Sequence, residues 1–150
     1  MAQTQNAISW KNCEIEISTD AATWKDISGF SNSIKVDGGE RAIGEFFTVD
    51  GDTPILTAGK RSSLTITISA VYTEDAADAP YIMAQTAYEA ESALYVQWSP
   101  NGGGVGDQQF TSSRGHVTQP VYPAGAADSG DPIVIEIVVA VASISKATIT

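Results

Sequence analysis

The chain has 150 residues, the length of a single domain that can bury a hydrophobic core without disulfides. Eighteen acidic residues against eight basic ones give a net charge of −10, which argues against proteins that grip nucleic-acid phosphates or anionic membranes. One cysteine, Cys13, and one histidine, His116, exclude an internal disulfide and leave little for metal binding or acid–base catalysis. Composition therefore predicts one globular domain, residues 1–150, that is not an enzyme and carries no cofactor.

The sequence predicts neither a signal peptide nor a membrane-spanning segment. The first six residues contain no Lys or Arg and no apolar stretch, so we expect no signal peptide. The longest apolar run, residues 137–142, is far shorter than the roughly 20 residues that span a bilayer. We expect synthesis in a reducing cytoplasm, a passive half-buried Cys13, and a flexible N-terminal arm over residues 1–11.

The first half of the chain alternates polar and apolar residues in short runs. These runs predict strands at residues 14–17, 24–27 and 33–36. Gly38 and Gly39 supply the positive φ of a tight hairpin turn, so we expect residues 40–49 to return beside the third strand. The adjacent Phe46 and Phe47 break the alternation, which indicates that both faces of this return strand are covered in part.

A long loop is expected next, over residues 49–61, in which Ile55 and Leu56 have no strand of their own. Residues 63–72 then form the clearest strand, with apolar side chains on one parity and Ser or Thr on the other.

The hydrophobic period changes to a helical one after this strand. Met83, Ala87, Ala90 and Leu94 recur at helical spacing, with Asp78 as the expected N-cap. Three further strands are predicted, at residues 94–98, at residues 108–119 with a bend or bulge near Gly115, and at residues 132–145. The sum is a mainly β fold, an antiparallel two-sheet sandwich or open barrel with one flanking α-helix.

Residues that carry chemistry form no strong constellation. His116 has Ser112 and Ser113 as near neighbours along one predicted strand, where their side chains converge poorly for nucleophilic catalysis. Three tryptophans and several tyrosines are suited either to stacking on sugars or to packing in the core.

The distribution of charge is more informative. No Lys or Arg occurs between Arg61 and Arg114, an interval that carries six acidic residues. This pattern fits either a solvated face or an assembled surface that must not bind a polyanion, such as a channel that passes DNA. The basic residues Lys35, Arg41 and Lys60 lie before this interval, where they can pair with acids on neighbouring copies.

Several stretches together resemble the tail tube, or major tail, proteins of long-tailed bacteriophages. These are the expected hairpin at 34–49, the loop at 49–61, the strand that runs to residue 74, the Gln97-Trp98-Ser99-Pro100-Asn101 stretch and the closing apolar strand. The resemblance covers residues 12–145.

The resemblance implies hexameric rings that stack into a hollow tube, the conduit for DNA delivery into the host. It implies a place in the virion tail after synthesis in the host bacterial cytoplasm, DNA that passes without specific binding, and no membrane contact. The implied partners are other copies of the chain, a tape measure protein, a tail terminator, and baseplate or tail-tip proteins.

Two sets of site residues follow from the resemblance. The candidate lumen-lining residues are Asp37, Glu40 and Glu45. The loop is expected to contact a neighbouring subunit or ring through Asp52, Pro54, Ile55, Leu56, Lys60 and Arg61. Two other classes stay open, a tail terminator or other virion ring or decoration protein, and a glycan-binding adhesion module.

Overall fold

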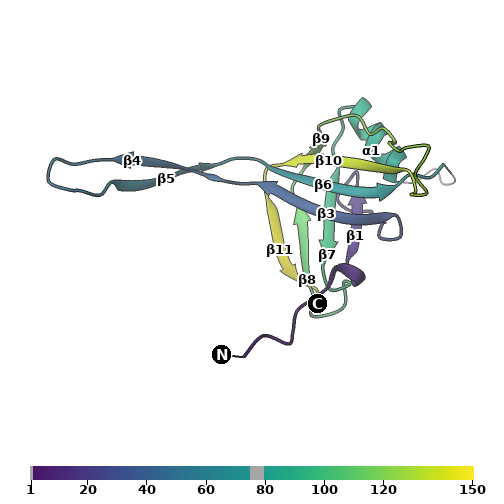
Figure 1. The fold of residues 1–150 in the computed structure, drawn as a ribbon, viewed down its shortest axis with the longest axis horizontal. Helices are drawn as coiled ribbons and strands as arrows, with labels where there is room; N and C mark the ends of the chain where they lie inside the picture. Colours follow the sequence, from purple (N-terminus) through teal and green to yellow (C-terminus); the bar gives the residue numbers. More distant parts are fainter. Residues whose placement is uncertain (1, 75–79) are drawn as a thin grey trace.

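The computed structural model describes residues 2–74 and 80–150 (Figure 1). Its elements in chain order are a 3-10 turn (Trp10–Asn12), β1 (Glu14–Ser18), β2 (Lys25–Asp26), β3 (Ser31–Gly38), β4 (Arg41–Phe46), β5 (Ile55–Arg61), β6 (Leu64–Val71), α1 (Pro80–Glu89), β7 (Tyr95–Ser99), β8 (Gln108–Ser112), β9 (Gly115–Val117), β10 (Val134–Val141) and β11 (Ile144–Thr148).

Two antiparallel sheets enclose the core, which confirms the predicted sandwich. Sheet A has the strand order β11-β8-β7-β1-β2, and sheet B has the order β3-β6-β10-β9. The alternating side chains of each sheet meet between them, so that Ile17 and Val96 from sheet A and Ile68 and Ile137 from sheet B are fully buried. The parity predicted for residues 63–72 is confirmed, because Ile66, Ile68 and Ala70 are all buried.

Asp20 closes the turn between β1 and β2. Its carboxylate accepts hydrogen bonds from the backbone N–H groups of Thr23 and Ala22 and from the Ser18 hydroxyl, at 2.8–2.9 Å. These bonds stabilise the charged form, and they lower the pKa of Asp20 to about 2.

Two long strands expected near the C-terminus are each divided between the sheets. Residues 108–119 form β8 in sheet A and β9 in sheet B, and residues 132–145 similarly form β10 and β11. The two bends lie side by side, since the Ser113 N–H donates to the Ser143 carbonyl at 2.9 Å and the Ser143 N–H donates to the Ser113 hydroxyl at 3.1 Å. The bend expected near Gly115 is present between β8 and β9. The prediction of one continuous strand in each stretch was wrong, because each segment crosses from one sheet to the other.

The expected hairpin between residues 33–36 and 40–49 was also wrong. Gly38 and Gly39 do have positive φ, at 86° and 75°, but the chain bends there without reversing. β3 pairs with β6, from Ser31↔Ala70 to Gly38↔Leu64, and this register sets the half-buried Ile34 beside the buried Ile68. A Cβ on Gly38 would collide with the Ser63 carbonyl of the paired strand, so the close approach of the two chains requires glycine.

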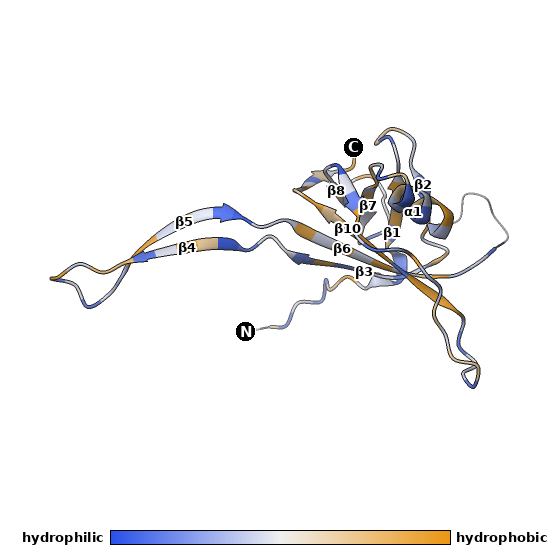
Figure 2. Ribbon diagram, turned by 90° about the horizontal axis from the view of Figure 1, so that it is seen from above, coloured by the Kyte–Doolittle hydropathy of each residue, from blue (hydrophilic) through white to orange (hydrophobic). Residues whose placement is uncertain are grey.

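The expected loop at 49–61 is a strand over most of its length. β5 occupies Ile55–Arg61 and pairs with β4, so the irregular part shrinks to residues 47–54. Ladder hydrogen bonds with β4 satisfy one edge of the β5 backbone, so Ile55 and Leu56 lie in a regular strand although no core covers them. We call residues 40–61 the arm; it projects from the body as a two-stranded ribbon (Figures 1 and 2).

The helix predicted from the apolar spacing is α1, which is shorter than the pattern suggested. Ala84 and Ala87 of α1 are buried. Leu94 is also buried but lies beyond the end of the helix, where its N–H donates to the Gly115 carbonyl at 3.0 Å. The predicted N-cap, Asp78, falls outside the described residues. No helix of the described residues is long and apolar enough to cross a membrane.

Candidate assembly surfaces

The arm exposes more large apolar side chains than any other part of the described chain. No residue of β4 or β5 is buried. The exposed apolar residues on the arm are Ile43, Phe46, Phe47, Val49, Ile55 and Leu56. An exposed apolar surface of this kind is typical of a protein–protein contact.

Both faces of the arm carry apolar side chains. Residues directly opposite in an antiparallel pair share a face. One face therefore holds the pairs Phe46↔Ile55 and Gly44↔Thr57, which are uncharged. The other holds Glu45↔Leu56 and Ile43↔Ala58. Burying the apolar residues on both faces of the ribbon requires a contact on each face, which a single neighbouring surface cannot supply.

Cations gather at the base of the arm. Arg41 and Arg61 are direct partners in the ladder, and Lys60 adjoins them. Like charges directly opposite each other destabilise a ladder. Arg41 donates to the Gly59 carbonyl at 3.0 Å, but among the described residues no carboxylate lies within ion-pair distance of these three side chains. The base of the arm is therefore positioned to receive negative charge from another molecule.

The face of sheet B turned away from the core is polar and lies in line with the arm. We call it the outer face, and it comprises Ser33, Lys35, Asp37, Thr65, Thr67, Ser69, Glu136, Val138, Ala140 and His116. Lys35 and Asp37 form an exposed ion pair on it, with the Nζ and Oδ2 atoms 3.4 Å apart. Hydroxyl groups dominate the remainder.

The three candidate lumen residues do not share one surface. Asp37 lies on the outer face of sheet B, and Glu40 lies between β3 and β4, where its carbonyl accepts from the Ser62 N–H at 2.8 Å. Glu45 lies on the arm, on the same rung as Leu56. The outer-face residues of β6 and β10 were not predicted as candidates, although the Ser and Thr parity of residues 63–72 was the signal that could have found them.

The six candidate contact residues all lie on the arm. Asp52 and Pro54 belong to its tip, and Ile55, Leu56, Lys60 and Arg61 belong to β5. The structure thus brings this set together on one projecting element.

Unpaired strand edges offer a second means of association. β3 is the edge strand of sheet B, and among the described residues β4 pairs only with β5. The free edge that runs from Ser31 to Phe46 is about 50 Å long at about 3.3 Å per residue. Free edges of this length invite pairing with a strand of another chain.

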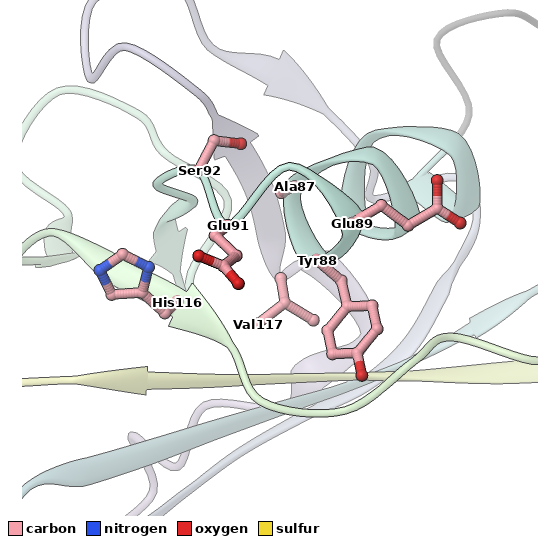
Figure 3. A pocket seen from close by; sticks show the side chains of 7 residues that line it. All are labelled: Ala87, Tyr88, Glu89, Glu91, Ser92, His116 and Val117. Atoms are coloured by element: carbon pink, nitrogen blue, oxygen red, sulfur yellow. The ribbon is translucent and has the colours of Figure 1, made fainter.

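His116 lies at a shallow hollow of about 370 Å³ between β9 and the end of α1, together with Glu91 and Tyr88 (Figure 3). The Ser112 hydroxyl, by contrast, accepts a hydrogen bond from the Val96 N–H in sheet A at 2.9 Å. Ser112 is therefore not placed to pair with His116 at this hollow. Among residues 2–74 and 80–150, no group of three or more His, Cys, Asp or Glu side chains is placed to hold a metal ion.

Cys13 and Trp98 pack in the body of the domain. Burial, with the nearby Glu14 carboxylate as the smaller cause, raises the pKa of the half-buried Cys13 to about 11. Trp98 is buried and stacks on Phe110 with ring centroids 5.5 Å apart, so it packs in the core. Trp10 is exposed beside the N-terminal segment.

Comparison with known proteins gives matches at the level of structure. No family model matches the chain, and no curated protein matches its sequence. The SPP1 tail tube superposes with a TM-score of 0.72 at 14% identity, covering 96% of this chain and 81% of that one. A chain from the PVC sheath/tube terminator of an extracellular contractile injection system gives 0.67 at 17% identity, covering 97% and 100%. A chain from a gene transfer agent tail with C6 symmetry gives 0.65 at 14% identity, covering 99% and 100%. The chain therefore has the fold of tail tube proteins, and the resemblance predicted from the sequence is confirmed for the fold.

Proposed function

We propose that this chain is a structural tail protein of a virion or virion-like particle, and that its copies form rings that stack into a hollow tube. The observation that carries the proposal is the arm, which is folded as a regular ribbon yet has apolar residues on both faces and no cover within its own copy. Such a ribbon gains its hydrophobic stabilisation only when other copies cover it.

Ring formation is supported by the strand edges. The free edge of β3 and β4 and the free edge of β5 belong to different sides of one ribbon. Pairing one side with the other side of the next copy is a heterologous contact, which closes into a ring when the rotation allows it. Six copies per ring is the expectation, because the gene transfer agent tail of the same fold was solved with C6 symmetry.

The outer face of sheet B is proposed as the wall of the bore. Its hydroxyl groups stay hydrated, and its one lysine, Lys35, is paired with Asp37. A wall of this composition offers few fixed cations to a phosphate backbone, so DNA can pass without being held. Glu40 is proposed to add negative charge at the junction with the arm, and Glu45 is proposed to add it farther along the arm.

The arm is proposed to join neighbouring subunits and rings. Ile55 and Leu56 supply apolar contact, Asp52 and Pro54 shape the tip, and Lys60 and Arg61 pair with acids of the adjacent copy. The tape measure protein, the terminator and the baseplate or tail-tip proteins are the proposed partners along the tube and at its ends.

A tail terminator is the second candidate function. A chain from the sheath/tube terminator structure of the contractile injection system has the same fold at a TM-score of 0.67, close to the value for the SPP1 tail tube. A terminator predicts a single ring that does not extend, whereas a tube subunit predicts rings that stack.

Negative-stain electron microscopy of the concentrated protein tests the proposal. We expect hollow tubes or stacked rings of uniform width; single rings would favour the terminator, and monomers at every concentration would contradict both.

A matched variant replaces residues 42–60 with Asn-Gly, joining Arg41 to its ladder partner Arg61. This variant is expected to fold with an unchanged melting temperature and to form no tubes. Deleting only residues 52–60 is a poorer test, because it removes most of β5 and leaves β4 unpaired. Tubes formed by the shortened variant would refute the role of the arm.

A further inference from the structure

A groove lies at the end of sheet B where β6 ends and β10 begins. Figure 1 shows that this end of the sheet is opposite the arm. β3 and β6 run into the arm at one end, and at the other end the last residue of β6, Val71, pairs with the first residue of β10, Val134. The segment that precedes β10 folds beside these strands. The groove between them has a volume of about 650 Å³.

The groove is formed by small and apolar side chains on an ordered backbone. Ala124, Ala126, Pro132 and Val134 line it. Ala124 and Val134 exchange backbone hydrogen bonds of 3.1 and 3.4 Å. Because these bonds hold the segment in place, the groove exists before anything occupies it.

The polar side of the groove is also fixed. The Ser129 hydroxyl donates to the Asp131 carboxylate at 3.0 Å and accepts from the Asp131 N–H at 3.1 Å. This arrangement places one negative charge at the groove. Ile133, which is 47% exposed, lines a second hollow that shares Ala124, Ala126 and Asp131 with the groove.

The arm tip and this groove are two uncovered apolar surfaces at opposite ends of one molecule, and neither can cover the other within a single copy (Figures 1 and 2). We propose that the groove receives the arm tip of a second copy through the uncharged Phe46–Ile55 face. This inference rests on the proposed function and names the receiving surface for the arm. A head-to-tail contact between opposite ends is heterologous, so it leaves a free tip and a free groove at the two ends of every assembly and can repeat without limit.

Charge selects the face of the arm that enters. The paired residues on the face with Phe46 and Ile55 carry no ionisable group, and Asp50 and Asp52 lie beyond these pairs in the turn at the tip. The opposite face carries Glu45 beside Leu56, and its insertion would bring a second carboxylate toward Asp131. Like charges brought together in a partly dry contact are unfavourable, so the Phe46–Ile55 face is the one that fits.

Cysteine cross-linking between two populations of the full chain tests the contact. One population carries Ile55→Cys and the other Ala126→Cys, both in a Cys13→Ser background, since Cys13 is the one cysteine of the sequence. After mixing, assembly and mild oxidation, we expect a disulfide-linked dimer that contains one chain of each population. A chain that carries both cysteines should give a ladder of linked copies.

A control on the other face of the arm makes the result specific. Leu56→Cys paired with Ala126→Cys should yield several-fold less dimer, because Leu56 faces away from the groove. Electron microscopy of the same samples separates the two levels of the argument. Tubes or rings without the Ile55–Ala126 link, or with equal linking through Leu56, would overturn the inference and leave the proposed function standing. A link formed within one chain, or a protein that never associates, would overturn the inference as well, and the latter would also overturn the proposed function.

Discussion

Substitution of Phe46 by serine should abolish a large part of the assembly energy and leave the monomer almost unchanged. An aromatic side chain buries about 150–250 Å² when fully covered, so covering the 68% of Phe46 that is exposed would remove roughly 100–170 Å² from water. At about 25 cal/mol per Å², full cover contributes about 2.5–4 kcal/mol, and half cover contributes about 1.3–2 kcal/mol.

The half-cover value predicts a rise of about tenfold to thirtyfold in the critical concentration for assembly. Pelleting of assembled protein at a series of total concentrations measures this quantity directly. The melting temperature of the unassembled protein should stay within error of the wild type, because Phe46 contacts no core residue. The matched control is Val105→Ser, which removes an 85% exposed apolar side chain from the β7–β8 connection and should leave the critical concentration unchanged. An unchanged critical concentration for Phe46→Ser would refute the argument that arm burial drives assembly.

Three further outcomes can be measured on the same protein. Gly38→Ala should lower the free energy of unfolding by about 1–3 kcal/mol in urea titrations, since its φ is positive and a Cβ has no room, whereas Gly29→Ala meets open space and should be nearly neutral. The pKa of folded Asp20 is about 2, below its ordinary value of 3.8, so the stabilisation from its charged form is present above about pH 4 and is lost as the pH falls toward 2. Melting temperatures across this range should therefore fall less steeply for Asp20→Ala than for the wild type. Asp37→Asn should leave tubes intact but increase their salt-sensitive retention of DNA by freeing Lys35, and the added change Lys35→Gln should reverse this; equal retention by all three proteins would remove the ion pair from the bore.

Local patterns in the sequence predicted individual strands better than their pairing. Alternation identified the strand at residues 64–71 and its buried parity, because that pattern records which side chains the core covers. Alternation did not identify the strand that pairs with β3. Two glycines with positive φ serve a bend as well as a reversal, and only the distant β6 strand determines which of the two occurs.

β5 was missed for a related reason. Its residues, Ile55–Arg61, have neither a buried face nor regular alternation, and no residue of it is buried in a single copy. Strand prediction from sequence looks for alternation between a buried face and an exposed face. β5 has no buried face in a single copy, so its residues were interpreted as a loop. The groove at residues 124–134 was missed too, because small side chains in a Gly- and Ala-rich stretch carry no periodic signal and gain meaning only beside β6 and β10.

The net charge of −10 offers a physical reason why a chain with so much exposed apolar surface can remain dispersed before it assembles. Copies that meet in random orientations bring like charges together, and this repulsion opposes nonspecific association. The arm differs from the rest of the surface, because its base carries Arg41, Lys60 and Arg61 and one face near its tip has no charge at all. An approach led by the arm therefore meets less repulsion than other approaches and gains both ion pairs and apolar contact. The same charge distribution that opposes association in random orientations thus favours the head-to-tail contact proposed above.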